Sequence, residues 1–513
     1  MGKLHVLLLC LAACGGGNGS SDDTGDDGGP AIDGGPVIAP PVTCDVPPEC
    51  MPVDSSASTN VVGTGTPGSC TTAALQAAVT AGGIVRFNCG AAPTTIVLTA
   101  PITINNVANA DKLGDTVIDG GGTVTLSGNH ANRILYLNAC VMPFNNAHCD
   151  TFPHPHLTVE RLTFVDASDD SADGGGAIYR LGGALTVIDS VFLRNRCATT
   201  GQDTAGGAIR LIQATPALIV GSTFGTETDG NKCSDGGAIG SLGASPVTII
   251  NSTVVGNTAT GNGGNPGNGG NAGGIYHDGG NISLTMCGVQ VAHNHGAAYG
   301  GGMFYVDDLG KGTVSITNTE ITDNDVPMVS GKPSFAGGAY LQGANVTMAN
   351  VTIANNTAGF AAGLYENSMN GRGTLDATNL TVTGMMGDGL TLDGGVTGTL
   401  LNATIANNTS TGINGAGPLV LANTLVAGNG KQCNAAASSA LGSLESGTGT
   451  CGATAGDPML GGLQDNGGTT HVRTMAPATA SPAAGAGSVM CPATDARGMP
   501  RPMTGCTSGA HQL

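Results

Sequence analysis

The chain has 513 residues, of which 87 are glycine, none is tryptophan and 10% are charged. Its 17 basic and 36 acidic residues give a formal net charge of −19, which excludes nucleic acid as a partner because the chain cannot replace the counterions of a phosphate backbone. Hydrophobic residues still make up 40% of the chain, so most of it should fold, and the abundance of glycine favours short strands joined by tight turns.

The first residues predict a secretion signal. Lys3 precedes an apolar stretch, residues 4–13, that is much shorter than the roughly 20 residues of a membrane-spanning helix. This stretch leads into Leu-Ala-Ala-Cys at residues 11–14, which resembles the lipobox of bacterial lipoproteins. The resemblance implies a signal peptide of residues 1–13, a diacylated Cys14 and a lipid-anchored location at the outer membrane or cell surface. An ordinary secretory signal with an incidental cysteine is the alternative.

Residues 14–43 are rich in Gly, Ser, Asp and Pro and cannot bury a core, so they predict a flexible acidic linker. After the linker, we expect residues 44–455 to form one repeat domain and residues 456–513 to form a distinct C-terminal module. The Ala-rich residues 71–80 are the only predicted helix, which should cap the first coil of the repeat domain and protect it from edge pairing.

The chain contains 15 cysteines, and all but Cys10 in the signal and Cys14 remain for the folded protein. Such abundance is typical of an oxidising compartment, although sequence alone leaves the connectivity open. The sequence has no paired Cys-x-x-Cys spacing, so the cysteines do not indicate a zinc site. Pairing each cysteine with its sequence neighbour leaves Cys287 single and gives six candidate disulfides: Cys44–Cys50, Cys70–Cys89, Cys140–Cys149, Cys197–Cys233, Cys433–Cys451 and Cys491–Cys506.

Two recurring motifs predict the architecture. One is a Gly-Gly-Ala-Ile step, as at residues 206–209, whose apolar column runs from Ile178 to Ile413. The other is Asn-x-x-apolar-x-x-Asn, as in Asn318 to Asn324 and Asn350 to Asn356. The shortest spacing between copies is about 23 residues, which suits one coil of three short strands and three corners.

These repeats predict an all-β protein, a right-handed parallel β-helix of about a dozen coils with a short N-terminal cap. We expect the stacked asparagine side chains, Asn350 among them, to point inward and to hydrogen-bond to one another and to the turn backbone. A leucine-rich horseshoe would need Leu-x-x-Leu-x-Leu steps, and a calcium-binding nonapeptide roll would need repeated Gly-Gly-x-Gly-x-Asp. The sequence has neither pattern.

The repeats resemble those of pectin-lyase-like β-helix proteins, especially polymorphic outer-membrane proteins, whose units are Gly-Gly-Ala-Ile and Phe-x-x-Asn. The literal matches are residues 206–209 and 192–195. Residues 456–513, with Asp-Pro-Met-Leu at 457–460, resemble the choice-of-anchor Q module that ends bacterial surface β-helix proteins. Here Ser-Gly-Ala-His at residues 508–511 replaces the usual acidic-Gly-Ala-aromatic-Glu ending, so we expect a frayed last strand.

A column of aromatic residues follows the apolar step and should point away from the core. Exposed rings in line could stack on sugars or on a protein partner. Alternatively, the rings pack on each other beneath the insertions, which crowd one corner of the coils. The candidate binding residues in this column are Tyr276, Phe304, Tyr340 and Tyr365.

Acidic residues on neighbouring predicted coils supply one candidate catalytic site. They resemble the carboxylates with which β-helix polysaccharide lyases hold calcium, while an Arg or Lys removes the proton that calcium acidifies. A solvated acidic surface paired with arginine is the alternative, and no other cofactor is indicated. The candidate calcium ligands are Asp169, Asp170, Asp173, Asp203 and Asp235, and the candidate catalytic residues are Asp173, Arg180 and Arg210.

The sequence contains no phosphate loop, zinc-protease motif or nucleophile elbow. We therefore expect a surface-anchored β-helix lipoprotein for adhesion or for envelope and glycan binding, without assigned catalysis. Its partner would be a glycan or a cell-surface protein, and it would contact the membrane only through the N-terminal lipid. The alternative is a secreted carbohydrate-active enzyme, a calcium-dependent polysaccharide lyase or a glycoside hydrolase, on the same fold.

Overall fold

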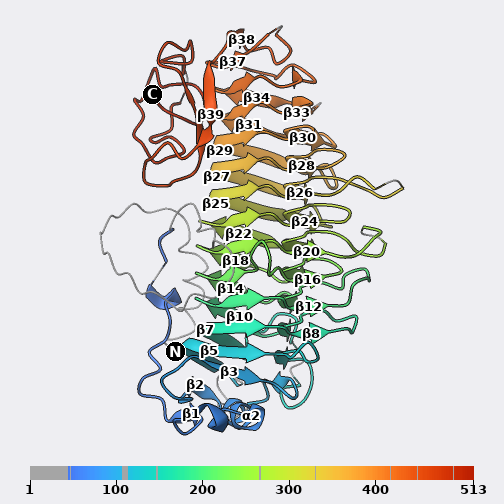
Figure 1. Cartoon of the computed structure of the whole chain (residues 1–513). Helices are drawn as coiled ribbons and strands as arrows, with labels where there is room; N and C mark the ends of the chain where they lie inside the picture. Colours follow the sequence, from blue (N-terminus) through green and yellow to red (C-terminus); the bar gives the residue numbers. More distant parts are fainter. Residues whose placement is uncertain are drawn as a thin grey trace.

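The computed structural model describes residues 44–46, 48–106, 114–145, 148–264, 267–329, 331–415, 417–447, 449–488 and 490–513. The predicted signal peptide, the linker and the lipidation site Cys14 lie outside these residues. The described chain is a right-handed parallel β-helix, a rod of stacked coils (Figure 1), which confirms the predicted fold class. None of the helices in the described part of the chain has the length and apolar character needed to span a membrane.

One side of the rod is a sheet of 12 parallel strands, which agrees with the predicted dozen coils. Consecutive strands pair in register, so the apolar column from Ile178 to Ile413 stacks one residue above another, as predicted. In stacking order these strands are β4 (Ile102–Thr103), β6 (Leu135–Asn138), β9 (Ile178–Leu181), β13 (Ile209–Ile212), β17 (Ile239–Leu242), β21 (Ile275–Gly279), β24 (Met303–Asp307), β26 (Ala339–Gln342), β28 (Leu364–Asn367), β30 (Leu390–Asp393), β33 (Thr411–Gly415) and β36 (Lys431–Cys433).

Most of the remaining wall is one sheet of 22 strands. In some coils a single strand bends from one side of the rod to the next, and in others the bend divides the strand in two. The strands are β1 (Asn60–Val62), β2 (Gly83–Phe87), β3 (Thr94–Val97), β5 (Thr116–Ser127), β7 (His156–Val165), β10 (Ala184–Ile188), β11 (Val191–Leu193), β14 (Ala217–Val220), β15 (Thr223–Phe224), β18 (Val247–Ile250), β19 (Thr253–Val255), β22 (Ser283–Cys287), β23 (Gln290–Ala292), β25 (Gly312–Thr322), β27 (Ala344–Ala354), β29 (Thr374–Thr383), β31 (Thr397–Leu401), β32 (Thr404–Ala406), β34 (Leu419–Ala422), β35 (Leu425–Ala427), β37 (Leu444–Glu445) and β38 (Thr454–Ala455).

Two smaller sheets complete the strands. Four strands stack at one corner of the coils, and two strands after the last coil pair antiparallel. The corner strands are β8 (Ser168–Asp169), β12 (Arg196–Cys197), β16 (Lys232–Cys233) and β20 (Thr258–Ala259), and the antiparallel strands are β39 (Leu460–Gln464) and β40 (Thr474–Pro477).

The helix α2 (Thr72–Ala81) covers the N-terminal end of the rod, as predicted. The side chain of Thr71 accepts a hydrogen bond from the backbone N–H of Ala74 and caps the helix. Its buried face of Leu75, Ala78 and Val79 closes the apolar interior. Two short 3₁₀ helices, η1 (Pro48–Cys50) and η2 (Pro67–Ser69), precede it.

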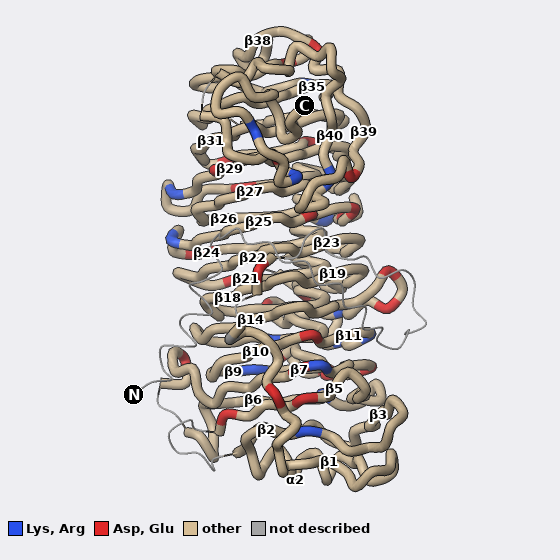
Figure 2. The backbone as a smooth tube through the Cα atoms, turned by 90° about the vertical axis from the view of Figure 1, so that its left-hand side faces the viewer, with Lys and Arg blue, Asp and Glu red and all other residues tan. Residues whose placement is uncertain are grey.

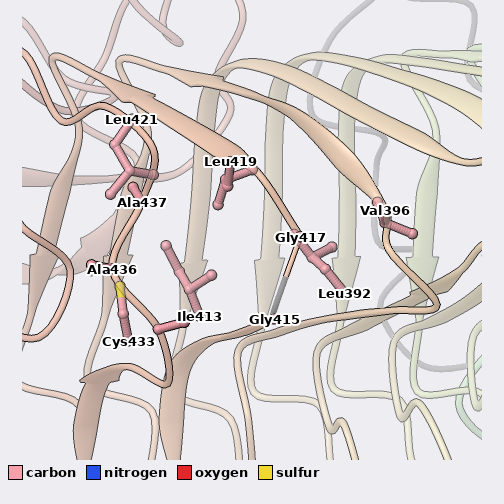
Figure 3. Close-up of a pocket in the computed structure, with 11 residues that line it drawn as sticks. Leu392, Val396, Ile413, Gly415, Gly417, Leu419, Leu421, Cys433, Ala436 and Ala437 are labelled. Carbon is pink, nitrogen blue, oxygen red and sulfur yellow. The ribbon is translucent and has the colours of Figure 1, made fainter.

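The interior of the rod is one continuous apolar cluster that runs from Val62 to Cys451. Phe192 stacks between Phe164 and Phe224 on the neighbouring coils, with ring centroids 4.7 Å apart on each side. Near the C-terminal end, a void lined by apolar side chains has a volume of only about 10 Å³ (Figure 3). In the described coils the interior is therefore filled with side chains, as in an ordinary protein core.

A ladder of buried asparagine side chains lines one corner of this interior. The Nδ2 of Asn294 donates to Oδ1 of Asn324, and that of Asn324 to Oδ1 of Asn356, each over 3.0 Å. Asn324 Nδ2 also donates to the carbonyl of Val291 at 2.9 Å. The same links join Asn195, Asn231, Asn257 and Asn294, and further on Asn408 and Asn429, which confirms the predicted inward ladder.

The two asparagines of the sequence motif occupy different places. The second one belongs to the buried ladder, but the first lies at a strand bend, where Asn350 has a φ of +55° and is only half-buried. Its neighbours in the stack are Asn318 and Asn379, each linked to it by a side-chain hydrogen bond of 3.0 Å. The expectation that Asn350 points inward is wrong, because the left-handed bend turns its side chain away from the lumen.

An N-terminal strap, residues 44–46 and 48–58, runs along the outside of the 22-stranded sheet. Its contacts follow one outward column of the sheet, coil by coil. The carbonyl of Ser58 accepts a hydrogen bond from Arg86, and the backbone N–H of Val53 donates to Glu160 at 2.9 Å. Cys50 packs on Leu218, Val220 and Ile250.

The strap explains why one predicted disulfide is wrong. Cys44 bonds to Cys287, not to Cys50, because the strap places Cys44 beside β22. Asn251 holds the same end of the strap, since its Nδ2 donates to the carbonyl of Cys44 at 2.8 Å. The other five predicted pairs are confirmed: Cys70–Cys89, Cys140–Cys149, Cys197–Cys233, Cys433–Cys451 and Cys491–Cys506.

The residues after β38 fold back against the outside of the last coils (Figure 1). They dock on the bend column, where Asn379 Nδ2 donates to the carbonyl of Thr494 and Asn402 Nδ2 to that of Thr507, each at 3.0 Å. Residues 506–511 are all buried and form no strand, so the expected frayed ending is wrong. The backbone N–H of Ala510 donates to Thr404 Oγ1, which places the end of the chain against the helix wall.

Candidate functional site

The predicted aromatic column exists, but its rings are packed rather than displayed. Tyr276, Phe304, Tyr340 and Tyr365 are neighbours in register, and their ring centroids lie 5.2, 5.1 and 5.0 Å apart in order. Tyr276 is fully buried, Phe304 and Tyr365 are 3% and 7% exposed, and Tyr340 is half-buried. Of the two interpretations left open by the sequence, packing beneath the insertions is the correct one.

A second row of residues covers this column. Ala272, Ala336 and Ala361 belong to the turns that lie over the rings. Tyr299 packs between Phe304 and Tyr340, with ring centroids 6.4 and 5.4 Å away. The four predicted binding rings therefore support the overlying turns, and a ligand could stack on them only after those turns had moved.

The two candidate catalytic arginines lie on opposite faces of the 12-stranded sheet. Arg210 pairs in register with Tyr179 on the outward face, whereas Arg180 pairs with Leu211 on the inward face. Arg180 is fully buried in the lumen, where its guanidinium donates to the carbonyls of Ile212 at 3.0 Å and Thr215 at 3.2 Å. Burial lowers the pKa of Arg180 to about 9. Its role is to satisfy turn carbonyls, so the catalytic prediction for Arg180 is wrong.

Part of the predicted acidic cluster does assemble around Tyr276. The Tyr276 hydroxyl lies within hydrogen-bonding distance of two carboxylates, Asp203 at 2.9 Å and Asp278 at 2.8 Å, and its single proton is donated to one of them at a time. Asp235 is 1% exposed, and burial raises its pKa to about 7. Arg210 is 3% exposed, and burial lowers its pKa although Tyr276 and Asp203 favour the charge. The sequence anticipated the grouping of Asp203, Asp235 and Arg210 but missed the tyrosine at its centre.

The candidate calcium ligands are dispersed. Asp169 forms an ion pair with Arg133, and Asp170 and Asp173 are exposed on the following turn. Asp235 accepts two hydrogen bonds from Asn271, from its backbone N–H at 2.8 Å and from its Nδ2 at 2.9 Å. Within the described ranges, no group of three or more His, Cys, Asp or Glu side chains is arranged to hold a metal ion. The five aspartates therefore do not form the predicted site.

The insertions at the loop corner carry an exposed apolar patch that the sequence did not single out. We define the loop-corner patch as Met328, Val329, Phe360 and Met386, whose exposed fractions are 80%, 50%, 41% and 64%. They lie on three consecutive coils, because Phe335 pairs with Phe360 and Thr357 pairs with Met386 in isolated bridges. The only sequence signal was the long insertion after Asn324.

Hydrogen bonds and ring contacts fix the shape of this patch. Ser334 Oγ donates to the carbonyl of Val326 and accepts from the backbone N–H of Gly359, both at 2.7 Å. Gly359 lies directly under Met328, since a Cβ at that position would come 2.9 Å from Met328 Cγ. The Phe360 ring lies 6.1 Å from that of Tyr365, so the buried aromatic column continues into the base of the patch.

No family model and no curated protein sequence matches this chain. Among solved structures, the periplasmic alginate epimerase AlgG is similar with a TM-score of 0.40 and 11% identity, over 69% of this chain and 77% of its own. The A-module of the mannuronan C-5 epimerase AlgE6 from Azotobacter vinelandii has a TM-score of 0.33 and 10% identity, over 76% of this chain and 98% of its own. Likeness of this degree carries no argument about what this chain binds or does.

Proposed function

We propose that this protein is an extracytoplasmic adhesion rod that binds a partner protein through the loop-corner patch. The observation that carries the proposal is the exposure of Met328, Val329, Phe360 and Met386 together on three coils. Contiguous exposed apolar side chains mark interaction surfaces in soluble proteins. Methionine adapts its shape to different apolar surfaces, which suits a protein partner.

The chemistry of the patch favours a protein over a glycan. Sugars are held by hydrogen bonds and by the faces of aromatic rings, whereas the side chains of Met328, Val329 and Met386 supply neither. The rings of the aromatic column are buried or half-buried beneath the overlying turns, and Phe360 is the exposed ring within the patch. The surface of the partner that contacts the patch is therefore expected to be apolar at its centre.

The cysteines support a location outside the cytoplasm. Six pairs lie at bonding distance, and disulfides persist in oxidising compartments. We propose that a lipid on Cys14 holds the rod at the bacterial surface. Cys14→Ser should then release the protein from membranes into the soluble fraction. Unchanged membrane partitioning, with no acyl chain found by mass spectrometry on the wild type, would show that the lipid anchor is wrong.

The binding proposal is tested by a fourfold serine variant, Met328→Ser, Val329→Ser, Phe360→Ser and Met386→Ser. It should fold with an unchanged circular dichroism spectrum and lose attachment to cells or to an isolated surface protein. A matched variant changes four exposed apolar residues elsewhere, Met142, Leu309, Leu441 and Met503, to serine and should attach like the wild type. Equal attachment by both variants would overturn the proposal.

A carbohydrate-active enzyme on the same scaffold is the second candidate. It is favoured by the cluster of Asp203, Asp235, Arg210 and Tyr276, because a carboxyl whose pKa is raised to about 7 can exchange a proton near neutral pH. The purified chain should be incubated with uronic-acid polymers, with and without calcium. Release of unsaturated uronides that Arg210→Ala abolishes would establish this candidate in place of adhesion.

A further inference from the structure

A polar hollow of about 250 Å³ lies at the N-terminal end of the rod, between the strap and strands β2 and β5. Pockets for drug-sized molecules measure about 300–1,000 Å³, so this one suits a single small molecule. Acidic and basic positions lie close together beside β5 and β7 (Figure 2). The polar side chains that line the hollow are Ser55, Ser56, Arg86, Thr94, Asp119 and Thr123.

The carboxylate of Asp119 is fully engaged within the protein. Oδ1 accepts from Arg161 Nε at 2.9 Å and from the backbone N–H of Gly121 at 2.8 Å. Oδ2 accepts from Arg161 Nη2 at 2.5 Å and from the hydroxyl of Ser55. A carboxylate offers about four acceptor positions, so none remains for another donor. Asp119 therefore shapes the wall of the hollow, and Arg161 balances its charge.

Arg86 is a cation on β2 in the wall of the hollow. It is the register neighbour of Asp119, but Asp119 is already paired with Arg161. Its Nε donates to the carbonyl of Ser58 at 2.8 Å, which fixes the guanidinium against the strap. Among the described residues, no carboxylate lies within ion-pairing distance of Arg86. A guanidinium in this state is a binding group for a planar anion.

We propose that the hollow binds a small hydroxylated carboxylate, an acidic monosaccharide such as glucuronate, free or at the end of an acidic glycan. The carboxylate pairs with the terminal nitrogens of Arg86, and the sugar hydroxyls bond to Ser56 and Thr123. Phe87 and Val124, which also line the hollow, supply the apolar wall against the sugar ring. This site is separate from the loop-corner patch and independent of the adhesion proposal.

Isothermal titration calorimetry on the full mature chain tests the site with glucuronate, glucose and acetate. Glucuronate should bind more tightly than glucose, which lacks the anion, and than acetate, which lacks the hydroxyls. Arg86→Gln should weaken glucuronate binding at least about tenfold, because a charge-assisted pair is lost. The control Arg372→Gln changes an exposed arginine on a later coil and should bind like the wild type. No heat at about 10 mM glucuronate, or equal binding by Arg86→Gln, would overturn the proposal.

A second variant leaves Arg86 untouched. Thr123 is exposed at the rim, so Thr123→Trp should fold normally while filling the hollow, and glucuronate binding should be lost. Retained binding would show that the sugar lies elsewhere. An oligoglucuronate that binds as tightly as the monosaccharide identifies the ligand as a glycan end, and one that does not bind identifies it as the free sugar. Either result supports an acidic-sugar site.

Discussion

Cys44 bonds to Cys287, 243 positions later in the chain, and thereby fastens the N-terminal strap to strand β22 across the outside of the preceding coils. Toward the N-terminal end of the rod the strap covers a polar side chain, Glu160. Toward Cys287 it covers apolar side chains such as Ile250. The strap, which forms no strand in its described residues 44–46 and 48–58, therefore links coils that are distant in sequence.

Removing this link should destabilise the protein. In Cys44→Ala with Cys287→Ala, the free energy of unfolding should fall by about 2–4 kcal/mol, because the unfolded chain regains the entropy of a long closed loop. Urea denaturation measures the loss. Cys140→Ala with Cys149→Ala opens a link of only 9 positions and should cost less. A non-reducing peptide map that joins Cys44 to Cys50 would contradict the connectivity.

The buried asparagine ladder should be more sensitive than the surface. Asn324→Leu removes the side-chain hydrogen bonds to Asn294, Asn356 and the carbonyl of Val291, and it leaves the buried backbone N–H of Asn294 without the Asn324 Oδ1 that accepts from it. The free energy of unfolding should fall by about 1–3 kcal/mol for each buried polar group that is left without a hydrogen-bond partner. Asn345→Leu, at an exposed position of β27, should change it little. Equal losses in the two variants would refute the ladder.

His277 should make stability depend on acid. It is buried in the lumen, and desolvation lowers its pKa from 6.5 to about 3. The folded state binds the His277 proton less tightly than the unfolded state does. The stability that neutral His277 contributes to the folded state is therefore complete above pH 6.5 and is lost as the pH falls towards 3. At about 1.4 kcal/mol per pKa unit, the loss amounts to a few kcal/mol.

The measurement is the urea midpoint across this pH range for the wild type and for His277→Leu, which should lose less stability in acid. His156, whose pKa burial lowers to about 4, keeps part of the dependence in both proteins. His130→Gln, at an exposed position, should follow the wild type. Parallel curves for the wild type and His277→Leu would show that His277 is not responsible.

Glu366 should have the opposite dependence. Its carboxyl is fully buried between Leu341 and Leu392 of the adjacent coils, and desolvation holds its pKa well above 4.5. The folded state therefore favours the protonated form, and stability present below pH 4.5 is lost as the pH rises. Glu366→Leu should raise the melting temperature at neutral pH and have less effect at pH 4.5. A lower melting temperature at neutral pH would contradict this explanation.

The sequence alone determined the coil architecture. The period of the Gly-Gly-Ala-Ile step places Ile178, Ile209 and Ile239 in one stack, and the structure pairs them in register. The cap helix and five cysteine pairs were predictable for the same reason, because each depends on residues close in the chain or on a repeated pattern. A solenoid buries its core through contacts between neighbouring repeats, so local periodicity is sufficient.

Only the tertiary structure decided what covers the outside of the rod. The pairing of Cys44 with Cys287 depends on a strap that crosses several coils, and the burial of Tyr276 depends on the turns that lie over it. Such segments have no period, and their packing depends on loop length and on the side chains they meet. Alternation along a strand separates inward from outward residues, but it cannot tell an outward residue in water from one beneath a turn.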